Sequence, residues 1–443
     1  MRLRLPHPLV LLLGGVAVAA LLTWILPAGA YDRTLDEASG RELVVAGTFK
    51  ITEAAPVGIL AAVLAVPRGI VAGADVILTV LIVGGVFALL DATGALSRLV
   101  GSLVGRTRRP RLVVVAVCLI FATLGALENM QEEIIALVPV LLVLSRGLGF
   151  GAITAIGMSA GSAAVGAAFG PTNPFQTGIA LRFAELPPLT QPALRFGLLA
   201  VALAVWIGYT ILMIPRDDQH PEVTPPATVP ATVPATARDL VLFAMVLLPF
   251  VPYVIGVMFY DFGFNELSAL FLVAGFGVGL VSGRDLSTTA ADLLKSMETM
   301  LAASMFIGVA RAISVVLTDG RVIDTIVHGL ASPLDGMPGT AAAMLMIPIQ
   351  SLLHIPVPSV SGQAVLTMPI MAPLADLLGV SRDAAVIAFQ TGAGLMDMLT
   401  PTSGALLAIL LIAKVDFGRW LRFAIPGTLL VALVGVAGIV LAG

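Results

Sequence analysis

The chain has 443 residues, of which 58% are hydrophobic and only 12% are charged, and its formal net charge is −3. One soluble core cannot bury this much apolar sequence, and a mean hydropathy of +1.04 is typical of a protein that crosses a membrane several times. The balanced charge without a basic tail argues against a nucleic-acid partner. A single cysteine, Cys118, excludes disulfides, and the four scattered histidines offer no pair with metal-ligand spacing.

The N-terminus is expected in the cytoplasm, because Arg2 and Arg4 precede the first apolar run. That run, residues 8–27, is long enough to span the bilayer, although it could also serve as a cleaved signal sequence. Residues 28–55 are polar and partly β-like, which indicates an external loop.

Residues 56–70 are too short and too interrupted, by Pro67 and Arg68, to span alone, and whether they cross or lie flat stays open. A return helix is predicted around 77–90. An amphipathic piece then leads to the basic run at 106–111, which should lie in the cytoplasm.

A hairpin is predicted over residues 111–146, with apolar arms at 112–126 and 134–144 around a polar, acidic tip. The second arm has only about 11 apolar residues where a spanning helix needs roughly 20, so the hairpin is expected to be re-entrant. The following helix, 151–185, is interrupted at 170–174 by Gly-Pro-Thr-Asn-Pro, which frees backbone groups at membrane depth.

A helix over 194–214 ends the first half, and the Pro/Thr/Ala-rich segment 215–238 is interpreted as a cytoplasmic linker. The second half, 239–443, is expected to contain a second hairpin and a second broken helix. Its expected elements are helices near 239–259, 266–283 and 294–317, an amphipathic stretch at 321–331, a hairpin over 338–378 with its tip at 356–363, a helix over 382–413 broken at 400–404, and a last helix at 420–441.

The two halves share a register. The same interval along the chain separates Pro139 from Pro369, Pro171 from Pro401, and Gly149 from Gly379. Counting crossings places the two hairpins on opposite faces. We therefore predict an all-α polytopic membrane protein built from two inverted repeats, 1–214 and 239–443, with nine crossings, two hairpins and an external C-terminus.

The hairpin tips and broken helices supply what an intramembrane small-molecule site needs, because free helix ends and hydroxyl or amide groups can bind a carboxylate or a cation. The candidates are Asn129, Gln131, Thr172, Asn173, Ser359, Ser361, Gly362, Gln363, Thr402 and Ser403. A sodium ion could lie near Asn129, Thr172, Asn173, Ser361 and Thr402. The alternative is that these motifs only kink membrane helices.

Glu128, Glu132 and Glu133 lie at the first tip, and an acid at membrane depth usually faces a partner, a cavity or a coupling ion. Glu128 and Glu132 would share one face if the tip is helical, whereas Glu133 would point elsewhere. The alternative is a shallow hairpin with hydrated acids.

Three further ionisable residues lie in apolar sequence. Asp397 precedes the second break and could face the first tip. Arg311 could pair with an acid or with a substrate carboxylate, and His354 is a candidate proton carrier or a hydrogen-bonded core residue.

The segments ALENMQEEIIALVPVLL, FGPTNPFQTGIA, VPSVSGQAVLTMPIMAPLADLLGVSR and DMLTPTSGALLAILLIAKV resemble the YfcC-like and four-carbon-dicarboxylate anaerobic carriers of the ion transporter superfamily, a family that also includes basic amino-acid exchangers. The resemblance covers nearly the whole chain outside the linker. It implies a homodimer in the inner (plasma) membrane, in which scaffold helices hold a mobile unit, about 111–185 and 338–413, that moves like an elevator with sodium or proton coupling or by exchange.

Better-known members of the superfamily carry Ser-Asn-Thr motifs at the hairpin tips. This chain has Glu128-Asn129 and Gln131-Glu132 at one tip and Ser359-Val360-Ser361-Gly362 at the other, which leaves the sodium stoichiometry and the substrate open.

The leading hypothesis is a secondary active transporter of amino acids such as arginine or ornithine, because Glu128, Glu132 and Asp397 offer negative groups and Arg311 a positive one. The alternative is a C4-dicarboxylate carrier of the succinate or fumarate type. An intramembrane enzyme lacks a catalytic dyad, and a channel fits inverted hairpins less well than alternating access does. No nucleotide-binding loop of the Walker type occurs, so gradient coupling or exchange would supply the energy.

Overall fold

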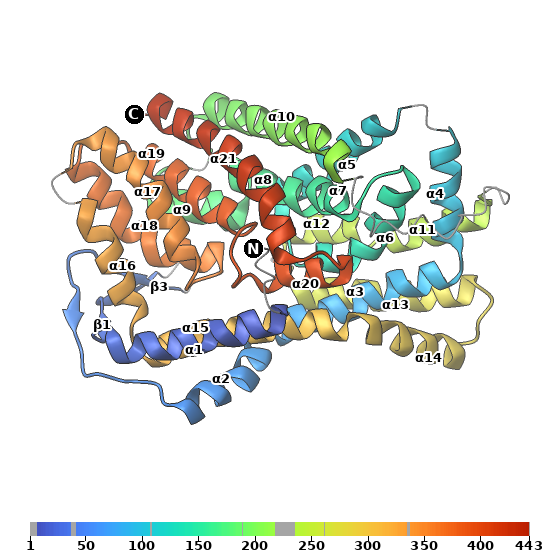
Figure 1. Ribbon diagram of the computed structural model, residues 1–443, viewed down its shortest axis with the longest axis horizontal. Helices are drawn as coiled ribbons and strands as arrows, with labels where there is room; N and C mark the ends of the chain where they lie inside the picture. The colour runs from blue at the N-terminus through green and yellow to red at the C-terminus, as the bar shows by residue number, and fades with distance from the viewer. Residues whose placement is uncertain are drawn as a thin grey trace.

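The computed structural model describes residues 7–36, 41–106, 109–187, 189–217, 235–260, 262–334 and 337–442, and these are mostly helical (Figure 1). Within these ranges, nine helical segments are long and apolar enough to cross a membrane. They are Pro8–Ile25, Ala74–Ala92, Pro110–Leu127, Ala152–Phe183, Pro192–Met213, Ala237–Gly256, Phe264–Val281, Leu286–Asp319 and Phe417–Ala442.

One layer of the molecule contains α1 (Pro8–Ile25), α2 (Ile59–Ala72), α3 (Ala74–Ala92), α13 (Phe264–Val281), α14 (Leu286–Met297) and α15 (Leu301–Asp319), as the lower half of Figure 1 shows. Small residues allow α2 and α15 to approach closely, because a side chain at Gly69 would collide with the backbone of Gly308 and Ala312. The 14-residue α2 exposes the opposite face, where Ile59 is 88% accessible.

The loop after α1 carries two short antiparallel ladders, β1 (Gly29–Ala30) with β4 (Lys50–Ile51) and β2 (Arg33–Asp36) with β3 (Arg41–Val44). This loop is attached to α16 (Ile323–Ala331). Asp324 accepts hydrogen bonds from the Tyr31 backbone N–H at 3.0 Å and from Arg33 at 2.9 Å. The Tyr31 hydroxyl lies 3.1 Å from His328 Nδ1. The β-like character expected of residues 28–55 is confirmed.

The other layer contains two sets of helices, in the segments where the hairpins and broken helices are predicted. The first set is α5 (Pro110–Glu128), α6 (Glu133–Gly147), α7 (Ala152–Ile156), η1 (Gly157–Gly161), α8 (Ser162–Phe169), η2 (Pro174–Gly178) and α9 (Ile179–Phe183). The second set is α17 (Gly339–His354), α18 (Val360–Leu377), α19 (Arg382–Phe389), η5 (Gln390–Gly394) and α20 (Gly404–Ala413).

Several boundaries of the two sets repeat at the interval seen in the sequence. The helices α6 and α18 end at residues 147 and 377, α7 and α19 begin at 152 and 382, and η2 and α20 begin at 174 and 404. Between the first two boundaries, Gly149 and Gly379 both adopt a positive φ, of 84° and 68°. Glycine has little steric cost there, so each helix can end in a tight turn.

Small residues also bring α5 and α8 together. A side chain at Gly125 would collide with the backbone of Ala163, and one at Gly166 with that of Ala122. Cys118 lies on α5 and is completely buried. The crossing fixes the end of α5, and therefore the first hairpin tip, against the first broken helix.

Two long helices, α10 (Pro192–Asp217) and α21 (Phe417–Ala442), lie side by side along one edge (Figure 1). Near the start of α10, the buried Arg195 pairs with Asp383 of α19 at 2.8 Å and donates to Gln390 of η5 at 2.9 Å. The guanidinium therefore connects α10 to the second broken helix.

The structure differs from the expected elements in four places. The helix expected from residue 294 begins as α14 at Leu286 and continues through η3 (Glu298–Met300) into α15. The segment 239–259 is divided into α11 (Ala237–Leu247) and α12 (Phe250–Phe259), since a turn intervenes next to Pro249. The second tip is shorter than expected, because α18 already begins at Val360, where the Ser359 side chain caps it.

The fourth difference concerns which segments are long enough to cross the membrane as single helices. The segment 382–413 is predicted to cross as a broken helix, and an irregular stretch at 397–403 divides it into α19 with η5 and α20, neither of which has the length of a span by itself. Conversely, α5, with 19 residues, has the length and composition of a span, although it is predicted to be a hairpin arm. Residues 218–234 of the expected linker lie outside the described residues.

Candidate substrate-binding site

A cavity of about 630 Å³ lies where the two layers meet. Both hairpin tips, the second break, α2 and α15 contribute to its wall. Nine of the residues predicted from sequence line it, namely Asn129, Gln131, Glu132, Arg311, Ser359, Ser361, Asp397, Thr402 and Ser403.

The first tip is not helical, because Asn129 ends α5 in the left-handed conformation with φ 58°. Its Oδ1 atom accepts a hydrogen bond from Gln176 Nε2 at 2.7 Å. Asn173 secures the same region from the broken helix. Its Nδ2 donates to the Gly125 carbonyl at 2.8 Å, and its Oδ1 accepts from the Phe175 and Gln176 backbone N–H groups at 2.9 and 2.7 Å. The first break is therefore bonded directly to the end of α5.

The side chains of the acids at the first tip are not directed as expected. Glu132 and Glu133 both line the cavity, because the chain between Asn129 and α6 is not helical. Glu133 is 4% exposed, and its carboxylate accepts from the Gln131 backbone N–H at 3.2 Å and from the Tyr253 hydroxyl at 3.4 Å. Glu132 forms no salt bridge and receives no hydrogen bond from another described residue. The Glu128 side chain lies outside the described part of the chain.

The second tip and second break each present the beginning of a helix to the cavity. Ser359 caps α18 by accepting from the Gly362 N–H at 3.2 Å, and Ser403 caps α20 by accepting from the Leu406 N–H at 3.3 Å. Thr402 donates to the Ile355 carbonyl at 2.8 Å, which fixes the break against the end of α17. A helix N-terminus attracts negative groups, so this part of the wall suits a carboxylate.

Asp397 is held by a buried histidine. His354, with no exposed surface, lies with its Nε2 atom 2.8 Å from Asp397 Oδ1 and its Nδ1 atom 2.8 Å from Gln363 Oε1. Gln363 is also completely buried, and its Nε2 donates to the Gln350 carbonyl at 2.7 Å. The Asp397 side chain is 11% exposed, so the carboxylate connects this buried network to the cavity.

The opposite wall, formed by α2 and α15, carries two arginines. Arg68 forms a two-pronged ion pair with Asp319, which also lines the cavity. Arg311 donates to the Ala72 carbonyl at 2.6 Å, and among the described residues it pairs with no carboxylate. Of the two partners left open for Arg311, an acid of the tips or a substrate carboxylate, the acid is not paired with it in the described residues.

Four predicted residues support the cavity wall from behind or stand beside it. Gln363 and Asn173 are completely buried, and Gly362 lies in the first turn of α18. Thr172 is exposed and donates to the Ala126 carbonyl at 3.4 Å.

Sequence reasoning missed Tyr253, Gln176 and Arg68 as parts of the site. Tyr253 comes from α12, and only the folded chain brings its hydroxyl to Glu133. Gln176 follows the first break closely, and its position beside a polar interruption was the one signal that could have identified it. Arg68 was noted only as an obstacle to membrane crossing.

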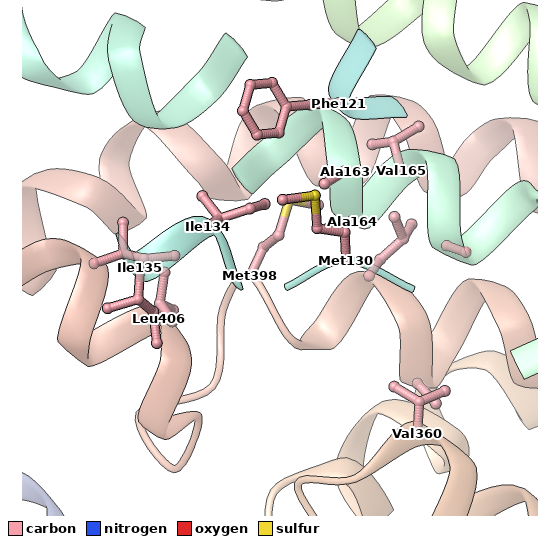
Figure 2. Close-up of a cluster of buried hydrophobic side chains, with 14 of the residues drawn as sticks. Phe121, Met130, Ile134, Ile135, Ala163, Ala164, Val165, Val360, Met398 and Leu406 are labelled. Atoms are coloured by element: carbon pink, nitrogen blue, oxygen red, sulfur yellow. The ribbon is translucent and has the colours of Figure 1, made fainter. Parts of the chain in front are cut away.

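Beside the cavity, the first tip and the second broken helix share an apolar core. Figure 2 shows Met130 and Met398 with their side chains directed toward one another, among Ile134, Ala163 and Ala164. Met130 is 0% and Met398 3% exposed. Apolar burial thus joins the two polar motifs into one unit. Within the described residues, no group of three or more His, Cys, Asp or Glu side chains could hold a metal ion.

Comparison with known families gives a match over residues 5–443 to the model described as DcuC, C4-dicarboxylate anaerobic carrier. The chain belongs to this family. Membership in the C4-dicarboxylate anaerobic carrier family agrees with the nine apolar segments found in the described residues and establishes a multi-pass membrane transporter.

Two relatives of this family member span most of its length. It is 28% identical over 390 residues to the Escherichia coli protein named "Putative basic amino acid antiporter YfcC", covering 83% of this chain and 77% of the relative. It is 26% identical over 476 residues to a Haemophilus influenzae protein of unstated function, covering 95% and 93% of the two chains.

Among solved structures, the family member is similar to the YdaH transporter of Alcanivorax borkumensis, with a TM-score of 0.42 and 16% identity over 98% of this chain and 97% of that one. It is also similar to MtrF of Neisseria gonorrhoeae, with a TM-score of 0.42 and 15% identity over 98% and 94%.

Proposed function

We propose that the protein is a secondary active transporter of amino acids with a positively charged side chain, such as arginine or ornithine. The observation that carries the proposal is the pair Glu132 and Arg311. Both line one cavity, and neither has a salt-bridge partner among the described residues. A basic amino acid can present a cation to Glu132 and its α-carboxylate to Arg311. Charged groups at membrane depth are costly when unpaired, so binding such a substrate would neutralise both.

The remaining charges of the cavity are already engaged. Arg68 is paired with Asp319, Glu133 is hydrogen-bonded to Tyr253, and Asp397 lies against His354. The name of the Escherichia coli relative describes a basic amino acid antiporter, which agrees with this assignment.

A C4-dicarboxylate carrier is the second candidate, and the family's own description favours it. A dicarboxylate would place one carboxylate at Arg311 and the other at the beginning of α18 or α20, where Ser359 and Ser403 cap the helices. Glu132 would then serve as a proton or sodium site rather than as a substrate ligand.

For the mechanism, we propose two inverted repeats whose hairpins and broken helices move together against the layer that contains α2 and α15. The equal sequence offset at three pairs of helix boundaries supports the repeats. The cavity between the two layers supports movement of one layer past the other. Sodium coupling near Asn129, Thr172, Asn173, Ser361 and Thr402, proton coupling, and exchange remain parts of this proposal.

For the assembly, we propose a homodimer in the inner membrane with a cytoplasmic N-terminus and an external C-terminus. The dimer is implied by the family, and the orientation follows from Arg2, Arg4 and the basic run at 106–111. An enzyme of the Ser-His type is disfavoured, because both ring nitrogens of His354 face Gln363 and Asp397 rather than Ser361.

The test is a thermal-shift screen of the detergent-solubilised chain with amino acids and dicarboxylates, with and without sodium, followed by uptake into proteoliposomes. A ligand at 100 times its Kd stabilises the folded state by about 2.7 kcal/mol, which is measurable. We expect stabilisation by arginine or ornithine that is lost in Glu132→Gln.

The matched control is Glu298→Gln, a change of the same chemistry at a glutamate in η3 that does not line the cavity. Stabilisation by succinate or fumarate that persists in Glu132→Gln, with no response to basic amino acids, would replace the proposal by the dicarboxylate carrier.

A further inference from the structure

The hydrogen-bond network around His354 determines where a proton must be. Gln363 Nε2 lies 2.7 Å from the Gln350 main-chain carbonyl, which can only accept. Gln363 must therefore direct its amide nitrogen there and its oxygen toward His354. The oxygen Oε1 lies 2.8 Å from His354 Nδ1, so Nδ1 carries a hydrogen and donates it.

The other ring nitrogen faces a carboxylate. With Nδ1 protonated, a neutral imidazole would direct the Nε2 lone pair at Asp397 Oδ1, which is 2.8 Å away. If Asp397 were ionised as well, two lone pairs would face each other inside the protein, where His354 has no exposed surface. This arrangement is unfavourable, so one proton must lie between Nε2 and Oδ1, on either partner.

Among the described residues, Asp397 is the charged group that contacts the His354 ring. On neighbouring elements, Asp324 of α16 pairs with Arg33, Asp383 of α19 with Arg195, and Asp376 of α18 with Arg382. The charged groups that share the cavity with Asp397 are Glu132, Glu133, Asp319, Arg68 and Arg311. Of these, Glu132 is the acid that could compete for the same proton.

Asp397 is also open to a ligand. It lines the cavity with 11% of its side chain exposed, while His354 lies behind it. A guanidinium or ammonium group bound to Asp397 would add a positive charge to a pair that is neutral with its proton. Loss of that proton to cavity water restores neutrality. The bound cation then offsets the repulsion between the ionised Asp397 and the Nε2 lone pair of neutral His354, which is unfavourable only while the cavity is empty.

We propose that the His354–Asp397 pair holds one proton in the empty cavity and releases it to water when one of the two cationic groups of a basic amino acid binds Asp397 while the other binds Glu132. This inference rests on the proposed function, and it deepens that function by assigning proton exchange to one pair of residues. One proton leaves for each cation bound to Asp397, so the pair with its bound cation carries the same net charge as the protonated pair.

The experiment measures protons released on binding by the purified full-length chain, with a pH-indicator dye in weakly buffered detergent solution and arginine as the probe. We expect about one proton per arginine bound, and an apparent Kd that rises about tenfold per pH unit as the pH falls below the pKa of the pair. In Asp397→Asn, arginine binding is expected to be weaker and to release no proton.

A second variant removes the ring nitrogens. In His354→Gln, the side-chain amide can donate to Asp397, so the carboxylate no longer needs a proton to avoid facing a lone pair. Arginine binding is then expected to release no proton and to lose its pH dependence. The control is His7→Asn at the start of α1, where asparagine can still cap the helix, and its proton release should equal that of the wild type.

Three results separate the outcomes. Arginine binding without proton release and without pH dependence would overturn the inference and leave the proposed function intact. Release that persists in Asp397→Asn would place the proton on another group and would also overturn the inference.

If no amino acid binds, the proposed function fails, and the proton site is decided without substrate. The measurement is then the ¹⁵N resonances of His354, identified as those missing in His354→Gln. Resonances that change with pH between about 5.5 and about 8.5 would support the proton site, and unchanged resonances would refute it.

Discussion

Asn173 and Ser403, at equivalent positions of the two halves, cap the second segments of the two broken helices. Asn173 accepts from the Phe175 and Gln176 N–H groups at the start of η2, and Ser403 accepts from the Leu406 N–H at the start of α20. The two side chains differ in one respect. Asn173 also donates to the Gly125 carbonyl of α5 at 2.8 Å, whereas Thr402 rather than Ser403 contacts the end of α17.

This difference predicts unequal effects of alanine. Ser403→Ala should cost about 1 kcal/mol through loss of the cap. Asn173→Ala should cost about 1–3 kcal/mol more, because it also leaves the Gly125 carbonyl without its donor in a buried site. The measurement is thermal unfolding in detergent. Equal effects of both alanine variants would refute the argument.

The position of Arg311 predicts a loss of substrate affinity with little loss of stability. Its guanidinium donates to the Ala72 carbonyl and otherwise faces the cavity. Arg311→Gln should weaken binding by about 2–5 kcal/mol, a loss typical of truncating one partner of a buried charge pair. Binding is measured by calorimetry on the solubilised protein. Arg422→Gln on α21, outside the cavity, is the control, and equal affinity loss in both variants would remove Arg311 from the site.

The close crossing of α5 and α8 predicts that Gly166 does not tolerate alanine. The added methyl group would meet the Ala122 backbone, which cannot move without separating the helices. We expect a destabilisation of about 1–3 kcal/mol, the usual effect of overpacking. Gly208→Ala on α10 adds the same group where no atom lies within 4 Å, and it should leave the melting temperature nearly unchanged. A melting temperature equal in both variants would mean that the helices adjust freely.

The Arg195–Asp383 pair predicts a non-additive double mutant. Arg195 is 3% exposed, so Arg195→Met would leave Asp383 unpaired in a buried site at a cost of about 3–5 kcal/mol. Arg195→Met combined with Asp383→Leu should be more stable than Arg195→Met alone. Chemical unfolding of the two single variants and the double variant measures this coupling. Additive effects would show that the pair contributes no interaction.

The contact of Tyr31, in the loop after α1, with α16 predicts a decrease in stability at alkaline pH. Burial, together with the nearby Asp324 carboxylate, raises the pKa of Tyr31 from 10.0 to about 12. The folded state thus retains the phenolic proton over a range where the unfolded chain loses it. The contribution of Tyr31 to stability should be constant below about pH 10 and fall as the pH rises toward 12. The stability difference between wild type and Tyr31→Phe should shrink over that range, and a constant difference would contradict the assignment.

Much of the fold follows from local sequence signals. Apolar length identifies eight of the nine spans found in the described residues, and the helix-breaking residues at 170–174 and 400–404 identify both breaks. The constant interval between matching residues of the two halves predicts where helices end and begin. The turn glycines Gly149 and Gly379 and the helix caps Asn173 and Ser403 occupy equivalent positions. These features depend on neighbours in the chain, which a sequence displays directly.

The site could be predicted only in part, because its contacts join distant segments. Glu132 and Asp397 are conspicuous as acids in apolar sequence, but the pairing of Asp397 with His354 depends on how α17 packs against the second broken helix. Tyr253 reaches Glu133 from a helix far along the chain. The start of α18 at Val360 was also missed, because the polar run Ser359 to Gln363 contains both the cap and the first turn.

The burial of Cys118 makes the natural chain suitable for site-specific labelling. The thiol is the only one in the sequence and has no exposed surface, so a maleimide probe should not reach it in the folded protein. A cysteine introduced at the exposed Ser359, on the second tip, would then be the single reactive position without any prior removal of thiols. Spectroscopic probes attached there can follow the tip under native conditions, and their accessibility from either side of a vesicle reports which face the cavity opens to.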